Sequence, residues 1–337
     1  DSVAQAMVAR GKGLLAADES LPTIEKRFKV INLASTPENH RLYRELLFTT
    51  PGLNEFISGV ILFDETIRQK AADGRTLVQV LTDQGIIPGI KVDEGAKPLA
   101  GFAGEKVTAG LDGLRERFAE YRGLGARFSK WRAVIAIGKD IPTSFAIEAN
   151  AHALARFAAL SQEAELVPIV EPEVLMDGDH SIERCEEVTM RVLERVFEEL
   201  AACGILFENM VLKPNMVIAG KNAPVQADPG MVARATVRCL RRRVPAAVPG
   251  IVFLSGGQTP QQASENLNAI GSLGAQPWEL TFSYGRALQD PVIQAWRGNP
   301  ANIKLAQQAL YHRARCNSLA RDGKYSQAVE SESPKTP

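Results

Sequence analysis

Short runs of apolar residues recur along the chain, and each is bounded by glycine, proline or polar turn residues. Eight of them have the length and composition of β-strands, and they cover residues 13–17, 59–63, 86–92, 131–137, 166–170, 210–213, 250–255 and 278–284. Most are continuously apolar and lack the alternation of apolar and polar positions that a half-exposed strand shows. They are therefore typical of parallel strands that are buried on both faces.

Segments with helical periodicity separate these runs. Residues 182–203 carry apolar side chains at helical spacing, such as Val188 and Val192, with charged residues on the opposite face. Residues 144–161 and 229–242 have a similar pattern. Because strand and helix alternate eight times without a linker, the pattern predicts an α/β fold, a closed (β/α)8 TIM barrel, in preference to an open doubly wound sheet.

The C-terminal end of the chain has a different composition. From about Arg313 it turns polar, and it finishes in the segment ESESPKTP (330–337). Polar segments of this kind bury too little apolar surface to offset the entropy of ordering them. The sequence therefore predicts a single catalytic domain over residues 1–312 and a mobile tail over residues 313–337.

Composition narrows the class of partner. The 337 residues include 39 Lys plus Arg and 39 Asp plus Glu, which gives a formal net charge of zero. A binder of nucleic acid or of an anionic membrane needs a positive surplus, so neither partner is expected and any basic site must be local. No apolar stretch approaches the ~18 residues of a membrane span, and no signal peptide is visible. A cytoplasmic location is therefore expected.

The predicted strands end on charged residues or glycines. In a barrel of parallel strands, catalytic residues lie at the C-terminal ends of the strands. In chain order these ends carry Asp18 with Glu19, Asp64 with Glu65, Lys91 with Asp93, Lys130 with Arg132, Glu171 with Glu173, Lys213, the turn 255–257, and Gly285 with Arg286. Charged groups in buried strands are costly unless they are paired. This ring of acids and bases therefore predicts a polar reaction centre at one mouth of the barrel.

Lys213 interrupts an otherwise apolar run, and packing gives no reason for a lysine there. A desolvated lysine near another cation, for which Lys130 is the candidate, becomes a nucleophile that forms a Schiff base with a carbonyl carbon. That chemistry needs a general acid and a general base, which Asp18, Glu171 and Glu173 could supply. The structural alternative is a lysine that only reaches out to solvent at a strand end.

Two features predict phosphate binding. The Ser-Gly-Gly turn at 255–257 offers free backbone N–H groups to an anion, and Arg286 follows the eighth run. The loops after strands seven and eight are the usual phosphate site of such barrels. Ser20, Lys26 and Arg27, which follow the first run, could complete this site.

Metal and nucleotide chemistry find no support in the sequence. The four histidines fall in helical or loop segments, none ends a predicted strand, and none has HxxxH or HxH spacing. The four cysteines contain no CxxC pair, and no GxGxxG motif or P-loop follows a strand. We therefore expect catalysis without a metal and without a nucleotide cofactor.

Seven motifs carry a resemblance to a known family. The chain resembles class I fructose-1,6-bisphosphate aldolases in GKGLLAADES (11–20), GIKVD (89–93), KWR (130–132), VEPE (170–173), LKPNM (212–216), FLSGGQ (253–258) and TFSYGRALQ (281–289). The motifs occur in the order that the family has, and the match runs from about residue 10 to residue 325.

The resemblance implies a lyase of glycolysis and gluconeogenesis. Such an enzyme reversibly cleaves fructose 1,6-bisphosphate into dihydroxyacetone phosphate and glyceraldehyde 3-phosphate, needs no metal, and is usually a homotetramer. By resemblance, Lys213 forms the Schiff base, Glu171 is the acid and base for dehydration of the carbinolamine, and Asp18 acts on the C4 hydroxyl. Lys130 would stabilise the site electrostatically and Glu173 would orient the lysines. The division of acid and base roles between Asp18 and Glu171 stays open.

The resemblance also implies a set of substrate-binding residues. Lys91 and Arg132 would contact the hydroxyls and the far phosphate. The remaining phosphate contacts would come from Ser20, Arg27, Ser255, Gly256, Gly285 and Arg286.

The chain departs from the family pattern in two places. The family commonly has Ser-Thr-Gly-Ser after its first strand, whereas here Ser20 is followed by Leu21, Pro22 and Thr23, so a proline with a fixed φ replaces a flexible glycine. Many members end in a tyrosine that assists proton exchange, whereas no tyrosine follows Tyr325 here. The phosphate contacts of the first loop and the proton-exchange step are therefore expected to differ.

Two other functions are compatible with parts of the pattern. A related Schiff-base aldolase would prefer fructose 1-phosphate or sedoheptulose bisphosphate. A non-catalytic binding protein would be expected to have lost members of the charged set, but all of them are present.

Overall fold

Eight parallel strands close into a barrel, as the apolar runs predict. The structure is a computed structural model, and it describes residues 2–334. The barrel strands are β1 (Gly13–Ala17), β2 (Ile57–Leu62), β3 (Ile87–Lys91), β6 (Phe128–Ile135), β7 (Val167–Val174), β8 (Val211–Leu212), β9 (Gly250–Phe253) and β10 (Glu279–Tyr284). They neighbour one another in the order β1-β10-β9-β8-β7-β6-β3-β2, and β2 returns to pair with β1. The prediction of a TIM barrel is confirmed.

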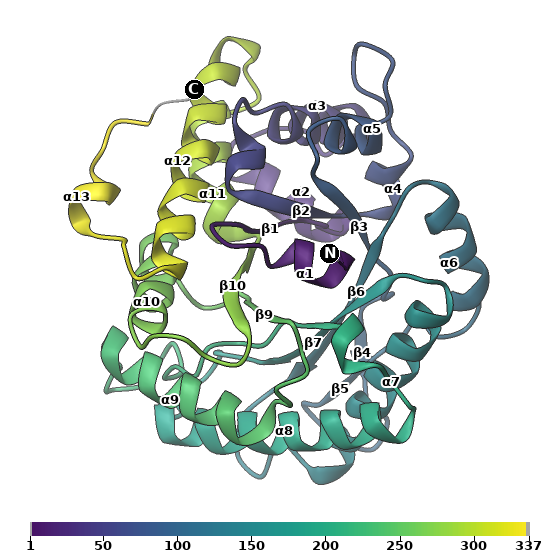
Figure 1. The fold of residues 1–337 in the computed structure, drawn as a ribbon, viewed down its shortest axis with the longest axis vertical. Coiled ribbons are helices and arrows are strands. Elements are labelled where there is room, and N and C mark those ends of the chain that lie inside the picture. The colour runs from purple at the N-terminus through teal and green to yellow at the C-terminus, as the bar shows by residue number, and fades with distance from the viewer. Residues whose placement is uncertain (1, 335–337) are drawn as a thin grey trace.

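Helices form a ring around the strands, and Figure 1 shows this ring with α1 across its middle. The helices are α1 (Val3–Met7), α2 (Leu21–Lys29), α3 (Pro37–Phe48), α4 (Asp64–Ile67), α5 (Leu77–Thr82), α6 (Leu114–Gly123), α7 (Ser144–Glu163), α8 (Ile182–Ala202), α9 (Pro229–Arg243), α10 (Pro260–Gly271), α11 (Arg286–Trp296), α12 (Ile303–Arg321) and α13 (Gln327–Glu330). The three helices expected from periodicity begin where Thr143, Ser181 and Asp228 accept a hydrogen bond from the first turn. Such capping satisfies N–H groups that have no partner within the helix.

Apolar side chains fill the barrel interior. Leu14, Ile61, Phe128 and Val252 belong to this inner cluster, and α1 packs against it from the N-terminal end of the strands. Phe128 has room because its neighbour on β3 is Gly89, where a Cβ atom would come within 2.1 Å of the ring. Apolar side chains therefore fill the barrel axis, and chemistry is expected at the C-terminal ends of the strands.

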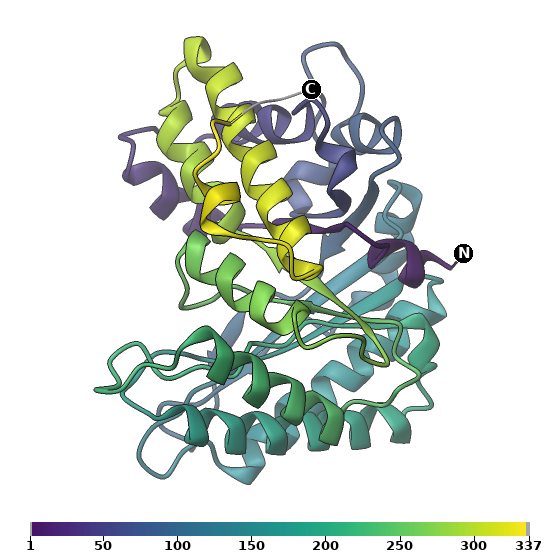
Figure 2. The same cartoon turned by 60° about the vertical axis from the view of Figure 1, so that its left-hand side comes forward.

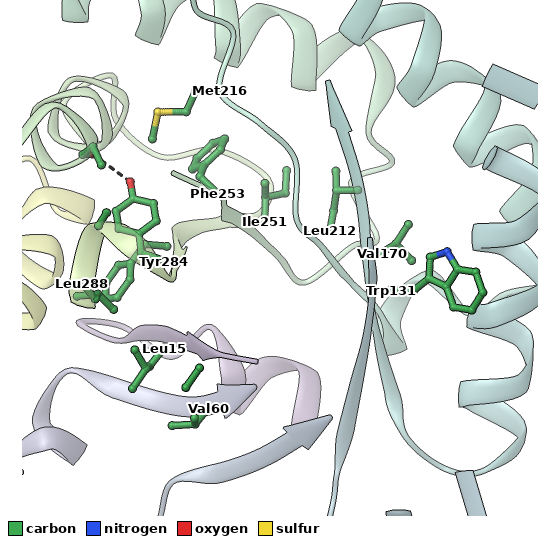
Figure 3. Packing of buried hydrophobic residues seen from close by; sticks show 14 of the residues in the cluster. Leu15, Val60, Trp131, Val170, Leu212, Met216, Ile251, Phe253, Tyr284 and Leu288 are labelled. Atoms are coloured by element: carbon green, nitrogen blue, oxygen red, sulfur yellow. Dashed lines mark hydrogen bonds between the residues drawn. The ribbon is translucent and has the colours of Figure 1, made fainter. Parts of the chain in front are cut away.

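The outward faces of the same strands are also buried. Leu15, Val60, Val170 and Leu212 point away from the barrel axis into the layer between strands and helices (Figure 3). In this layer the hydroxyl of Tyr284 donates to the Ala263 carbonyl oxygen at 2.9 Å. Both faces of the barrel strands therefore exclude water, which explains why the predicted runs are continuous and not alternating.

The strand limits differ from the apolar runs at two places that matter for the site. β7 continues from Val170 through Val174, so Glu171 and Glu173 lie inside the strand and not beyond its end. β8 ends at Leu212, although the Lys213 N–H still donates to the Val170 carbonyl oxygen at 2.8 Å. A two-stranded antiparallel hairpin, β4 (Ala96–Pro98) and β5 (Lys106–Thr108), follows β3 and was not anticipated from the sequence.

The proposed start of the tail at residue 313 is wrong, because that residue lies inside α12. Arg313 is 3 % exposed and pairs with Glu330 of α13, and Tyr325 donates to the same carboxylate at 2.7 Å. Figure 2 shows α13 lying along α12. Polar composition predicted a mobile segment, but these polar groups satisfy one another across the fold. Residues 335–337 of the predicted tail lie outside the described part of the chain.

The helices of residues 2–334 give no candidate for a membrane span, since none of them combines the necessary length with sufficient apolar character.

Candidate active site

The predicted strand-end pair Asp64 and Glu65 lies outside the site, because Asp64 pairs with Arg68 and Glu65 with His40. Thirteen other residues that the sequence and the resemblance single out line one cavity. It has a volume of about 590 Å³ and lies at the C-terminal ends of the barrel strands. The residues are Asp18, Ser20, Arg27, Lys91, Lys130, Arg132, Glu171, Glu173, Lys213, Ser255, Gly256, Gly285 and Arg286. Parallel strands deliver their ends to one rim, so residues far apart in sequence meet there.

Lys130 occupies the centre of the charged cluster. Its Nζ atom lies 2.7 Å from Asp18 Oδ2 and 3.3 Å from Glu171 Oε2, and all three side chains are buried. Burial alone would lower the pKa of Lys130, but the charges of Asp18, Glu171 and Asp93 outweigh it and raise that pKa well above its ordinary value. Lys130 is therefore a permanent cation at neutral pH.

Asp18 is held in its charged form by the two neighbouring lysines, Lys130 and Lys213. Burial raises its pKa, but the positive charges of Lys130 and Lys213 and the hydrogen bond from Lys130 lower it to about 2. Asp18 is thus a carboxylate that can accept a proton only when its neighbours change.

Lys213 lies on the other side of Glu171. Its Nζ atom is 3.6 Å from Glu171 Oε1, and its side chain is 6 % exposed. The second oxygen of Glu171 lies near Lys130 but makes no hydrogen bond within residues 2–334. One carboxyl group therefore stands between a buried amine and a permanent cation, with one oxygen facing each of them.

The charge of Asp18 predicts a pH dependence of stability. Its pKa is about 2 in the folded protein and 3.8 ordinarily, so between these values the unfolded chain binds more protons. The stabilisation is fully present above the ordinary pKa and is lost as the pH falls through 3.8 toward 2, by about 2 kcal/mol. We expect the difference in the free energy of unfolding between wild type and Asp18→Asn to shrink over this range in urea titrations. A difference independent of pH would contradict this charge assignment.

A second cluster holds the far side of the cavity. Arg132 Nε donates to Glu173 Oε2 at 2.5 Å, and Lys91 Nζ lies 3.3 Å from Asp93 Oδ1. The other Asp93 oxygen accepts the backbone N–H of Arg132 at 3.1 Å. Burial alone would lower the pKa of Arg132, but Glu173 and Glu171 raise it above its ordinary value. Two cations therefore project into the cavity from fixed positions.

Two turns at the rim offer N–H groups to an anion. Within the described chain, the backbone N–H groups of Gly256 and Gly257 have no acceptor. A Cβ on Gly256 would come within 2.7 Å of Glu173 Oε1, so any side chain there would displace that carboxylate. Arg286 begins α11 after the last barrel strand, and it has no ion pair within residues 2–334. Free N–H groups and a helix start beside an arginine are suited to phosphate.

The segment after β1 is a helix start and not a flexible loop. Ser20 is the N-cap residue of α2, its Oγ atom lies 3.1 Å from Thr23 Oγ1, and Pro22 sits in the first turn, where a missing N–H costs nothing. Arg27 reaches the cavity from the next turn, but its guanidinium donates to Glu19 at 2.6 Å. The departure from the family pattern thus preserves a hydroxyl pair at the rim.

Sequence reasoning missed several residues of this cavity. The sequence places Glu19 at a strand end, but it does not reveal the bonds of Glu19 to Arg27 and to the buried Gln289. Ser283 is buried, lines the cavity, and has a hydroxyl without a hydrogen-bond partner among the described residues. Its place in the motif at 281–289 is the feature of the sequence that could have identified it. Nothing in the sequence points to Lys221, because it lies in a loop that has neither strand nor helix periodicity.

One group of side chains has the spacing of metal ligands. His312 and Cys316 lie one turn apart on α12, and with Glu330 they place ligand atoms within 4.8 Å of one another. Arg313 donates to both oxygens of Glu330, so a fixed positive charge already occupies the carboxylate. This repulsion argues against a cation there, and the group acts as a clamp between α12 and α13.

Together these observations define a (β/α)8-barrel protein with a buried lysine and carboxylate centre between anion-binding turns. A family model described as class-I fructose-bisphosphate aldolase matches residues 1–336. A probable fructose-bisphosphate aldolase class 1 of Xanthomonas campestris pv. campestris is 58% identical over 323 residues, which cover 96% of this chain and 97% of that protein. The fructose-bisphosphate aldolase of Dictyostelium discoideum is 54% identical, with 96% of this chain and 92% of that protein covered.

One solved structure is similar to this chain over nearly the whole of both chains. It is a ternary complex of Plasmodium falciparum fructose-bisphosphate aldolase with TRAP and a small-molecule inhibitor, with a TM-score of 0.95 and 52% identity, and the match covers 96% of this chain and 94% of that one. The chain belongs to the class I fructose-bisphosphate aldolase family, which is the metal-independent, Schiff-base type.

Proposed function

We propose that this protein reversibly cleaves fructose 1,6-bisphosphate into dihydroxyacetone phosphate and glyceraldehyde 3-phosphate through a Schiff base on Lys213. The observation that carries the proposal is the contact of the buried Lys213 amine with Glu171, 3.6 Å apart, beside the Lys130 cation. Family membership and the relatives named as aldolases support the same reaction.

The first step joins the amine to the ketone. Glu171 accepts a proton from Lys213, the neutral amine attacks the C2 carbonyl carbon, and a further proton passes from that nitrogen to the carbonyl oxygen to give a carbinolamine. Glu171 then protonates the C2 hydroxyl, water leaves, and an iminium ion forms. The position of Glu171 within reach of the Lys213 nitrogen supports this role, and the positive charge of Lys130 favours return of Glu171 to the carboxylate.

The second step breaks the C3–C4 bond. A carboxylate removes the proton of the C4 hydroxyl, the C4–O double bond forms, and the electron pair of the C3–C4 bond moves into the iminium to give an enamine. The low pKa of Asp18, about 2, keeps it charged and suits it to hold the C4 hydroxyl. Protonation of the enamine at C3 and hydrolysis of the iminium release the ketone product and restore Lys213.

The two ends of the substrate need separate anion sites. We assign one phosphate to the Ser255–Gly257 turn with Gly285, Arg286, Ser20 and Arg27, and the other to the side of the cavity that carries Lys91 and Arg132. Glu173 would orient Arg132 through the bond at 2.5 Å. The iminium supplies the electron sink, so the proposed cycle uses no metal and no other cofactor.

Borohydride trapping tests this proposal. Reduction in the presence of fructose 1,6-bisphosphate should fix the ligand to the enzyme as a secondary amine, and a peptide map should locate it on Lys213. Activity should persist in EDTA. An adduct on a different lysine, or none at all, would overturn the assignment.

The proposal extends to substrate preference and to assembly. Two anion sites favour a bisphosphate over fructose 1-phosphate, which kcat/KM ratios for the two sugars and for sedoheptulose bisphosphate would measure. A homotetramer in the cytoplasm follows from the resemblance, and a relative from Arabidopsis thaliana at 53% identity is named cytosolic. Light scattering on the purified protein would give the subunit number. Zero net charge supports neither a nucleic acid nor a membrane as partner.

A further inference from the structure

Lys221 lies on the cavity wall but has no part in the proposed chemistry. It belongs to the segment after β8, and it lines the same cavity as Ser255, Gly256 and Gly257. We propose that Lys221 is a further phosphate-binding residue, which adds a positive charge over the turn at 255–257. This inference rests on the proposed function, because it takes that turn to bind the phosphate next to the ketone.

The backbone around Lys221 is firmly held. Its N–H donates to the Met176 carbonyl oxygen at 2.8 Å, and two flanking bonds, from Gly220 to His180 and from Asn222 to Gly178, are 2.8 and 2.9 Å long. These three bonds join the segment after β8 to the segment after β7. Lys221 therefore projects from a fixed base, which reduces the entropy lost when it binds a ligand.

The side chain of Lys221 reaches over the glycine turn. Gly257 has a φ of +80°, and a Cβ built on it would lie 2.7 Å from Met176 Cβ and 3.6 Å from Lys221 Cε. Only glycine fits this backbone conformation and this close approach. The end of the Lys221 side chain thus lies next to Gly257, so its ammonium group can turn from Asp177 toward a phosphate bound at the N–H groups of the turn.

The present partner of Lys221 is weak. Its Nζ atom lies 3.4 Å from Asp177 Oδ1, and the two side chains are 47% and 70% exposed. An exposed ion pair of this kind contributes about 1 kcal/mol or less to stability. A doubly charged phosphate is a stronger partner than one exposed carboxylate, so it can take Lys221 from Asp177 on binding.

Lys221→Met tests the inference, with dihydroxyacetone phosphate as the probe because it carries only the phosphate next to the ketone. The concentration that half-saturates borohydride trapping, and the KM for fructose 1,6-bisphosphate, should both rise about tenfold, while kcat changes by less than about twofold. Lys221→Arg keeps the charge and should restore most of the affinity. Lys139→Met is the matched control, since Lys139 is an exposed lysine that follows β6 and does not line the cavity.

The outcomes separate this inference from the proposed function. If wild type is trapped and Lys221→Met half-saturates at the same concentration as wild type, Lys221 does not bind phosphate and the inference is wrong. If Lys221→Arg is as weak as Lys221→Met, the side chain acts through packing and the inference is also wrong. If wild type itself is not trapped, the proposed function fails, whatever Lys221 does.

Discussion

Lys213→Met is expected to lower kcat by roughly 10⁵-fold or more, the scale seen when a covalent nucleophile is removed. Methionine keeps the length of the side chain and its apolar stem but removes the nitrogen that forms the Schiff base. Because the Lys213 side chain is 6 % exposed, an apolar replacement fits its surroundings and should preserve the fold. Steady-state kinetics and borohydride trapping would measure the loss.

The matched control is Lys304→Met, which removes an exposed lysine of α12 away from the cavity. It should retain full activity and the adduct. Retention of trapping in Lys213→Met, with its thermal unfolding unchanged, would mean that a different amine is the nucleophile. Lys130 is the nearest candidate by position, but its strong pairing with Asp18 and Glu171 keeps it protonated.

The barrel itself was predictable because its physical signature is local. A strand that is buried on both faces must be apolar along its whole length, and eight such runs, separated by helical segments, leave few architectures. β1 matches its predicted run, 13–17, at both ends. The position of the catalytic mouth followed as well, since parallel strands place their C-terminal ends together.

The limits of β7 were not predictable from apolar content. Glu171 and Glu173 interrupt the run, yet they continue the ladder, with Arg132 opposite Glu171 and Val134 opposite Glu173. Their charges are tolerated inside the barrel because Lys130, Lys213 and Arg132 neutralise them. That compensation depends on contacts between strands, which a pattern read along one strand does not contain.

The tail failed as a prediction for a related reason. The composition of a segment shows how many polar residues it has but not which partners they find in the fold. Arg313 and Glu330 are 17 positions apart and meet because α13 packs on α12. The cavity residues Glu19 and Lys221 show the same limit. Their roles come from what lies opposite them in space, Arg27 in one case and the glycine turn in the other.

Glu171→Gln is expected to lower kcat by roughly 10³-fold, the size of a lost general acid and base. The amide keeps the shape of the carboxyl group but cannot give a proton to the departing hydroxyl. It also removes one negative charge between Lys130 and Lys213, so the mouth becomes more positive and the KM for a bisphosphate should stay the same or fall. A loss confined to kcat, measured across pH, is the signature of an acid and base role.

Glu173→Gln provides the matched control on the same face of β7. Its carboxylate bonds Arg132 and makes no contact with Lys213, so kcat should fall by only about tenfold, while KM rises as Arg132 loses its orientation. A rise in KM is therefore expected for Glu173→Gln and not for Glu171→Gln. A larger loss of kcat in Glu173→Gln than in Glu171→Gln would transfer the acid and base role to Glu173. If kcat falls equally in the two variants and KM rises in both, the two carboxylates serve only to hold the cations in place. Asp18 would then be the residue that carries the proton.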